Sequence, residues 1–169
     1  MRYDAGEVIT AMVTPMNLKR EVDYDKVESL SRYLIEHGSD SVLVCATTGE
    51  CPTLTHDEET EIISSAKRGV ANKAKIIASA GSNSTETAIM CAKKAQKEEV
   101  DAILSVVPYY NKPSQVGIIE HFSAIAKSVD LPVIMYNIPS RTGVTMQAST
   151  VAYLANEFDN IVIWILQQS

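Results

Sequence analysis

Short runs of apolar, mostly β-branched residues recur along the chain, and longer segments with a helical repeat of apolar positions separate them. None of the runs alternates cleanly between apolar and polar positions, and each is too short for a helix. Both properties are typical of strands that are buried on both faces. The predicted strands span residues 8–14, 41–46, 75–80, 101–106, 131–137 and 160–165.

The segments between the strands predict five helices. Asp23 is positioned to cap the first of them, and Gly38 to end it. Thr55 and Glu58 form the capping-box pattern at the start of the second. Apolar or small residues at helical spacing define the five buried faces: Val27, Leu30 and Leu34; Ile62, Ala66 and Val70; Ala88, Ala92 and Ala95; Ile118, Phe122 and Ile125; Val151, Leu154 and Phe158.

This alternation of strands and helices predicts a parallel α/β sheet with right-handed crossovers. By itself it leaves an open doubly wound sheet and a closed barrel as alternatives. No Gly-x-Gly-x-x-Gly pattern opens the first helix, which disfavours a dinucleotide-binding fold. The repeat length suits a (β/α)8 TIM barrel, which needs about 250 residues. Since 169 residues supply about five and a half βα units, we expect a single, C-terminally truncated domain, 1–169, that forms an incomplete barrel.

The composition narrows the class of protein. A formal net charge of −6 and a pI near 5.1 disfavour nucleic acid and anionic membranes as partners. Cys45, Cys51 and Cys91 have neither paired nor metal-like spacing, and we interpret them as small apolar residues in a reducing compartment. The first residues show no signal-peptide pattern, and no segment approaches the ~18 apolar residues of a membrane span. We therefore expect a soluble, cytoplasmic protein.

Polar loops follow the carboxyl ends of three predicted strands, the side on which a barrel carries its active site. Thr47 and Thr48 precede Gly49, and their hydroxyl and backbone donors suit a small carboxylate, although an ordinary β–α turn has the same composition. After the fourth strand, Tyr109 and Tyr110 point in roughly opposite directions. One of them can then face the site while the other packs on another surface, but read alone they are more simply surface or interface aromatics.

The third loop follows the fifth strand. Tyr136 at a strand terminus suits proton transfer, and Arg141 suits bidentate binding of a carboxylate. A solvated polar loop is the alternative. His37, His56 and His121 have no metal-ligand partner at useful spacing, so no metal site is expected.

Taken together and in this order, the loops resemble the dihydrodipicolinate synthase (4-hydroxy-tetrahydrodipicolinate synthase) family within the pyruvate Schiff-base and N-acetylneuraminate lyase superfamily. The resemblance covers about residues 5–162 and leaves 163–169 as an atypical tail. Four stretches carry it: residues 10–15 (TAMVTP), 47–54 (TTGECPTL), 108–115 (PYYNKPSQ) and 136–143 (YNIPSRTG). The threonine pair and the arginine favour the synthases over the neuraminate lyases.

The resemblance implies a reaction in which pyruvate forms a Schiff base with a lysine, becomes an enamine and attacks aspartate semialdehyde, in lysine and diaminopimelate biosynthesis. It implies a proton relay through Thr47, Tyr136 and a Tyr110 supplied across a dimer interface. Thr48 then holds the pyruvate carboxylate, Arg141 binds the semialdehyde, and Tyr109 packs at the interface. A homo-oligomer without metal or organic cofactor is expected.

The sequence departs from the family where the Schiff-base lysine is expected on the sixth strand. Aligned without a gap, Ile165 occupies the lysine position, and Lys112, the one lysine in a loop on the active face, is expected to point outward. Ala46 replaces the family's usual glycine. We therefore expect a chain that is inactive alone and prone to aggregate or self-associate through open strand edges. The alternatives are a related keto-acid aldolase with another nucleophile and a non-catalytic module that associates with full-length subunits.

Overall fold

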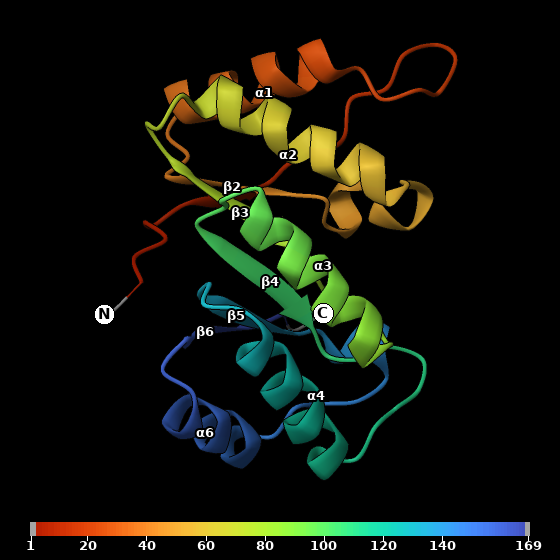
Figure 1. The fold of residues 1–169 in the computed structure, drawn as a ribbon, viewed down its shortest axis with the longest axis vertical. Coiled ribbons are helices and arrows are strands. Elements are labelled where there is room, and N and C mark those ends of the chain that lie inside the picture. The colour runs from red at the N-terminus through yellow and green to blue at the C-terminus, as the bar shows by residue number, and fades with distance from the viewer. Residues whose placement is uncertain (1–2, 168–169) are drawn as a thin grey trace. The chain divides into compact units, whose positions relative to one another are not determined.

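The structure is a computed structural model that describes residues 3–167. The chain divides into two compact units (Figure 1). The N-terminal unit contains Asp4–Ser79 and Glu98–Asp101, and the C-terminal unit contains Ala80–Lys97 and the residues from Ala102 onward. Each unit is a parallel sheet covered by helices.

The N-terminal unit is built on three parallel strands, with β2 paired to both others. Its elements are β1 (Ile9–Ala11), α1 (Tyr24–Glu36), β2 (Ser41–Val44), α2 (His56–Val70) and β3 (Lys75–Ser79), with short 3-10 turns at Thr47–Gly49 and Cys51–Thr53. All four residues of β2 are buried, as expected for a strand that is covered on both faces.

The predicted caps of the first two helices are confirmed. The Asp23 side chain accepts a hydrogen bond from the Lys26 amide at the start of α1. At the start of α2, the Glu58 amide donates to the Thr55 hydroxyl while the Thr55 amide donates to the Glu58 carboxylate. Both caps satisfy amide groups that a helix leaves free in its first turn.

The C-terminal unit has the same plan, with β5 paired to both β4 and β6 in parallel (Figure 1). Its elements are α3 (Thr85–Lys97), β4 (Ala102–Val106), α4 (Gln115–Ser128), β5 (Val133–Asn137), α5 (Pro139–Thr142), α6 (Ala148–Glu157) and β6 (Ile161–Leu166). The single helical turn α5 has no counterpart in the sequence prediction, because four residues are too few to show a helical repeat.

The core of the C-terminal unit includes the imidazole of His121. Ile118, Phe122 and Ile125 of α4 are fully buried, as predicted. His121 lies beside them, with Nδ1 2.8 Å from the hydroxyl oxygen of Thr85 on α3. Burial lowers the His121 pKa to about 4, so the imidazole is neutral at physiological pH. A neutral ring links α3 to α4 without placing a charge in the core.

The six predicted strands are all present, each within one to three residues of its predicted bounds. Among the described residues, no helix is both long enough and apolar enough to cross a bilayer.

Candidate active site

The threonine loop of the N-terminal unit lies directly after β2. Gly49 lies so close to the chain before α1 that an added Cβ would meet the hydroxyl of Thr14 at 3.0 Å and the carbonyl oxygen of Met12 at 3.1 Å. The Thr14 hydroxyl also donates to the Gly49 carbonyl at 2.7 Å. This contact fixes the short turn and leaves Thr47 and Thr48 exposed at the carboxyl end of the strand.

Ala46, at the position where the resemblance implies a glycine, has no strained backbone. Ala46 has φ −88° and ψ −176°, an extended conformation that any residue adopts. Its side chain is buried, so the extra methyl group is packed inside the unit.

The double-tyrosine loop of the C-terminal unit is held in an unusual backbone conformation. Tyr110 and Lys112 have φ values of +69° and +48°, in the left-handed region. The Asn111 side chain between them donates to the backbone carbonyl of Asn83 at 2.8 Å and accepts from the side-chain amide of Asn83 at 3.2 Å. Tyr110 is thereby presented almost completely exposed, at 89%. Asn83 and Asn111 are thus positioning residues that the sequence interpretation missed.

Ser114 ends this loop as the cap of α4. Its hydroxyl accepts a hydrogen bond from the Gly117 amide at 3.2 Å. Lys112 is exposed, as predicted, but it lies along the arginine loop instead of pointing away. Its Cε would be only 2.9 Å from a Cβ added to Gly143.

Tyr136 and Arg141 lie together in the C-terminal unit. Tyr136 is the second-to-last residue of β5, and the one-turn helix α5 carries Arg141 beyond it. Burial raises the Tyr136 pKa, while the positive charge of Arg141 lowers it. The phenol therefore stays protonated at neutral pH, within range of a cation that can bind a carboxylate.

The position beside Tyr136 on β6 belongs to Ile165. The two residues are paired across the parallel strands, as are Met135 with Trp164 and Asn137 with Leu166. Paired residues of neighbouring strands point to the same face of a sheet. The Tyr136 hydroxyl donates a hydrogen bond to the Gln167 side chain, two residues beyond Ile165 and on the same face. The Tyr136 phenol therefore lies beside the aliphatic side chain of Ile165 and the side-chain amide of Gln167, and β6 places no amine there.

Gln167 is a second residue that the sequence interpretation missed. It belongs to the tail that the resemblance set aside as unlike the family. The sequence nevertheless indicated that Gln167 lies on the same face as Ile165, because alternate residues of a strand face the same side and residue 167 follows residue 165 by two.

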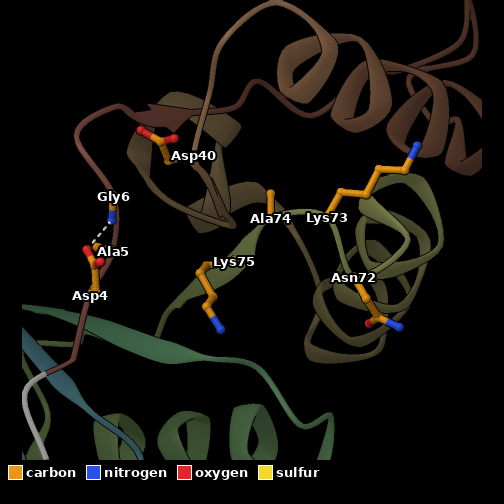
Figure 2. Close-up of a pocket in the computed structure, with 8 residues that line it drawn as sticks. All are labelled: Asp4, Ala5, Gly6, Asp40, Asn72, Lys73, Ala74 and Lys75. Atoms are coloured by element: carbon orange, nitrogen blue, oxygen red, sulfur yellow. Dashed lines mark hydrogen bonds between the residues drawn. The ribbon is translucent and has the colours of Figure 1, made fainter.

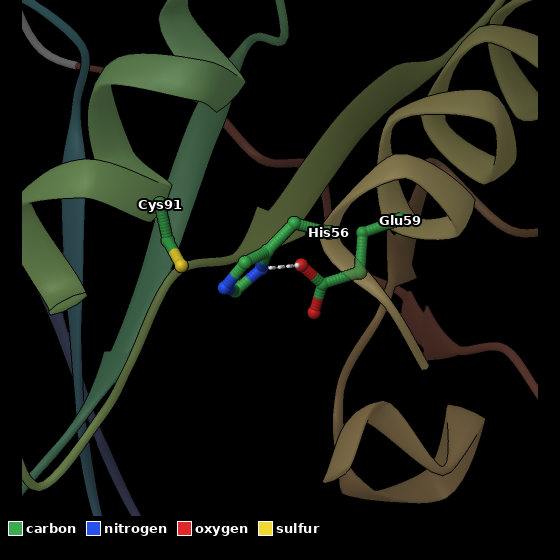
Figure 3. Close-up of side chains that lie close together, drawn as sticks. All are labelled: His56, Glu59 and Cys91. Carbon is green, nitrogen blue, oxygen red and sulfur yellow. Dashed lines mark hydrogen bonds and ion pairs between the residues drawn. The ribbon is translucent and has the colours of Figure 1, made fainter. Parts of the chain in front are cut away.

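Two other clusters of polar side chains serve local structure. His56 Nδ1 lies 2.8 Å from the Glu59 carboxylate, one turn along α2 (Figure 3). Cys91, which the figure also labels, belongs to α3 of the other unit. A pocket of about 240 Å³ lies in the N-terminal unit, beside the start of β3 (Figure 2). There, one oxygen of the Asp40 carboxylate accepts from the Glu7 and Val8 amides, so it holds the chain that enters β1.

Comparison with known proteins decides the family. The model of the dihydrodipicolinate synthetase family matches residues 4–163. The chain belongs to this family. It is 54% identical, over 157 residues, to the 4-hydroxy-tetrahydrodipicolinate synthase of Synechococcus sp., an alignment that covers 93% of this chain and 51% of the relative.

Solved structures of the family agree with this assignment. The structure of DHDPS from Cyanidioschyzon merolae with lysine bound is 52% identical, with a TM-score of 0.93 over 98% of this chain and 56% of that one. The chloride-inhibited dihydrodipicolinate synthase of Acinetobacter baumannii complexed with pyruvate is 42% identical, with a TM-score of 0.94 over the same shares. This chain therefore spans about half the length of its dihydrodipicolinate synthase relatives.

These matches confirm the predicted fold class, an incomplete TIM barrel of the dihydrodipicolinate synthase type. Of the residues predicted to form the site, the C-terminal unit brings Tyr136, Arg141 and the position of Ile165 together, with Tyr109 and Tyr110 on a neighbouring loop. Thr47 and Thr48 belong to the other unit. Their convergence with Tyr136 stays a prediction.

Proposed function

We propose that this chain carries the substrate-binding loops of a 4-hydroxy-tetrahydrodipicolinate synthase but lacks the amine on which its chemistry begins. The reaction condenses pyruvate with aspartate semialdehyde in lysine and diaminopimelate biosynthesis. It starts when a primary amine attacks the pyruvate ketone and water leaves, giving an imine that loses a proton to become the nucleophilic enamine. Catalysis is therefore absent from this chain alone.

Tyr136 and Arg141 supply the chemistry of the C-terminal unit in this proposal. A phenol whose pKa is raised by burial keeps its proton at neutral pH and can donate it to a developing alkoxide or imine nitrogen. The exposed guanidinium of Arg141 presents paired donors to the carboxylate of the semialdehyde. By the resemblance, the hydroxyl of Thr47 relays protons and Thr48 holds the pyruvate carboxylate.

The observation that carries the proposal is the pairing of Ile165 with Tyr136. An amine at this position of β6 would lie beside the phenol that protonates its adduct. The isoleucine side chain has no lone pair with which to attack a ketone. Lys112 is a poor substitute, because it lies exposed in the loop after β4 and is not the residue paired with Tyr136.

Incubation with pyruvate followed by borohydride reduction tests this proposal. We expect mass spectrometry to detect no lysine of this chain that gains the mass of a reduced pyruvate. The Synechococcus relative, treated identically, is the positive control and is expected to gain one pyruvate per chain. A pyruvate adduct on any lysine of this chain would overturn the proposal and favour a keto-acid aldolase with another nucleophile.

We further propose that the double-tyrosine loop contacts another family subunit, in a homo-oligomer or with a full-length chain. The support is the exposure of Tyr109 and Tyr110, at 41% and 89%, on a loop held by two left-handed residues. Large aromatic side chains that are rigidly presented to solvent are typical of interfaces.

Co-purification with the Synechococcus relative tests the interface. Changing both tyrosines to alanine is expected to weaken the association at least tenfold, since each buried aromatic anchor is worth about 2 kcal/mol or more. The matched control changes Tyr33 and Tyr153, exposed at 54% and 50% on other surfaces, to alanine and is expected to leave binding unchanged. Equal binding by the two double variants would exclude this loop as the interface.

A further inference from the structure

The arginine loop, residues 138–147, joins β5 to α6 and carries Arg141 on the single turn of α5. Its first half is held by its own backbone, since the amides of Arg141 and Thr142 both donate to the Ile138 carbonyl at 3.0 Å. Its second half, residues 144–147, forms neither helix nor strand. The contacts that hold this second half come from side chains outside the loop.

Two side-chain amides bind the backbone of this second half. Asn137, the last residue of β5, accepts from the Met146 amide at 3.2 Å and donates to the Met146 carbonyl at 3.3 Å. Gln115, the first residue of α4, donates to the Thr145 carbonyl at 2.9 Å and accepts from the Gln147 amide at 3.0 Å. In an extended segment, the backbone groups of successive residues point to opposite sides. The two side chains therefore hold the segment from both sides, as neighbouring strands would.

Both side chains are themselves fixed in the C-terminal unit. Asn137 is fully buried, and its partner Met146 is 1% exposed. The Gln115 side-chain oxygen also accepts from the Thr150 hydroxyl of α6 at 2.7 Å, which sets the orientation of the amide group. A side-chain amide has both a donor and an acceptor, so it can bind a backbone N–H and a carbonyl at once. The exposed Arg141 therefore lies on a loop that is closed by buried or doubly bonded contacts.

We infer that Gln115 and Asn137 are positioning residues, which hold Arg141 near the Tyr136 phenol so that it can bind the carboxylate of the semialdehyde. The inference rests on the proposed function, in which Arg141 is the group that binds this carboxylate. A binding group that is already held in place loses less conformational freedom when its ligand arrives. Neither Gln115 nor Asn137 contacts the substrate in this arrangement, and both act through the loop.

Gln115→Met tests the inference without any ligand, because it keeps the length of the side chain and removes its hydrogen bonds to the loop. The positive charge of Arg141 lowers the Tyr136 pKa. A loop that moves away from the phenol is therefore expected to raise this pKa. NMR titration of the tyrosine ring carbons measures it, with the Tyr136 signal assigned by comparison with the Tyr136→Phe chain. A Tyr136 pKa equal to that of the unaltered chain would overturn the inference.

Gln96→Met is the matched control, because it removes another glutamine that binds a backbone amide of the same unit. The Gln96 side chain on α3 accepts from the Asp130 amide at 2.7 Å and does not bind the arginine loop. We expect this variant to leave the Tyr136 pKa unchanged. An equal rise in both variants would mean that the whole unit has loosened, and it would count against a specific role of Gln115.

Hydrogen exchange of the unaltered chain tests the contact of Asn137 without any substitution. The Met146 amide belongs to a loop, but it donates to a fully buried side chain. We therefore expect it to exchange slowly, like the amides of β5. Exchange at the rate of an unstructured peptide would show that Asn137 does not hold the loop, and the inference would be wrong.

Binding of succinate semialdehyde, which has the aldehyde and the carboxylate of the proposed substrate without its amine, measures the effect on the site. By NMR titration, we expect Gln115→Met to bind this probe at least threefold more weakly than the unaltered chain, and Gln96→Met to bind it equally well. Equal binding by Gln115→Met and the unaltered chain would refute the inference. If the unaltered chain does not bind the probe but the Tyr136 pKa rises in Gln115→Met, the carboxylate-binding role of Arg141 fails and the positioning of Arg141 is supported.

Discussion

Replacing Ile165 with lysine is expected to give this chain an adduct with pyruvate that borohydride reduces. The new side chain would extend from β6 on the face of Tyr136, with which position 165 is paired. Partial burial at position 165 disfavours a protonated amine and therefore lowers its pKa. Each pKa unit lost raises the fraction of free amine at neutral pH about tenfold. The measurement is the mass of the reduced chain, with the modified residue located by peptide mapping.

Trp164→Lys is the matched control for this gain of reactivity. It introduces the same side chain one residue away in the same strand, but on the opposite face, paired with Met135. There the amine has no phenol beside it, and we expect no adduct. Adducts on both variants would mean that any lysine on β6 reacts. An unreactive but folded Ile165→Lys chain would mean that the C-terminal unit alone does not bind pyruvate productively.

The fold was predictable because it depends on short-range sequence patterns, such as helix caps and apolar runs. The capping box of Thr55 and Glu58 identifies the start of α2 without any tertiary information. Buried strands such as β2 are recognisable as short runs without charged residues, because none of their residues is exposed to solvent. Strand β6 continues beyond residue 163, where the family match ends, because IVIWIL keeps the β-branched character of a buried strand.

The site was less predictable, because its contacts depend on register and on loops with no repeating pattern. The bond from Tyr136 to Gln167 follows from the pairing of β5 with β6, which a linear sequence does not state. The hydrogen bonds between Asn83 and Asn111 join two loops 28 residues apart. Either asparagine alone looks like an ordinary loop residue. Motif resemblance singled out Tyr136 and Arg141 as candidates, but it gave no reason to expect a contact from the tail.

Because α1 packs closely on α2, we expect a methyl group added between them to cause a large loss of stability. A Cβ added to Gly69 of α2 would lie 2.0 Å from the Ser31 hydroxyl oxygen and 2.3 Å from the Glu28 carbonyl oxygen, both on α1. The carbonyl cannot rotate away without distorting the helix, and Ser31 is fully buried. We therefore expect Gly69→Ala to lower the free energy of unfolding by about 1–3 kcal/mol, measured by urea denaturation.

Gly117→Ala on α4 is the matched control, because it makes the same change in another helix. Its added Cβ would meet the Pro113 side chain at 3.3 Å and the Ser114 hydroxyl oxygen at 3.7 Å, contacts that need only a small adjustment. Alanine favours a helix over glycine by about 1 kcal/mol, so the control is expected to be neutral or stabilising. The same gain applies at Gly69, and the contact with α1 must exceed it for the variant to lose stability. Equal denaturation midpoints for the two variants would therefore mean that α1 and α2 separate at little cost, and that α1 is not a rigid part of the N-terminal unit.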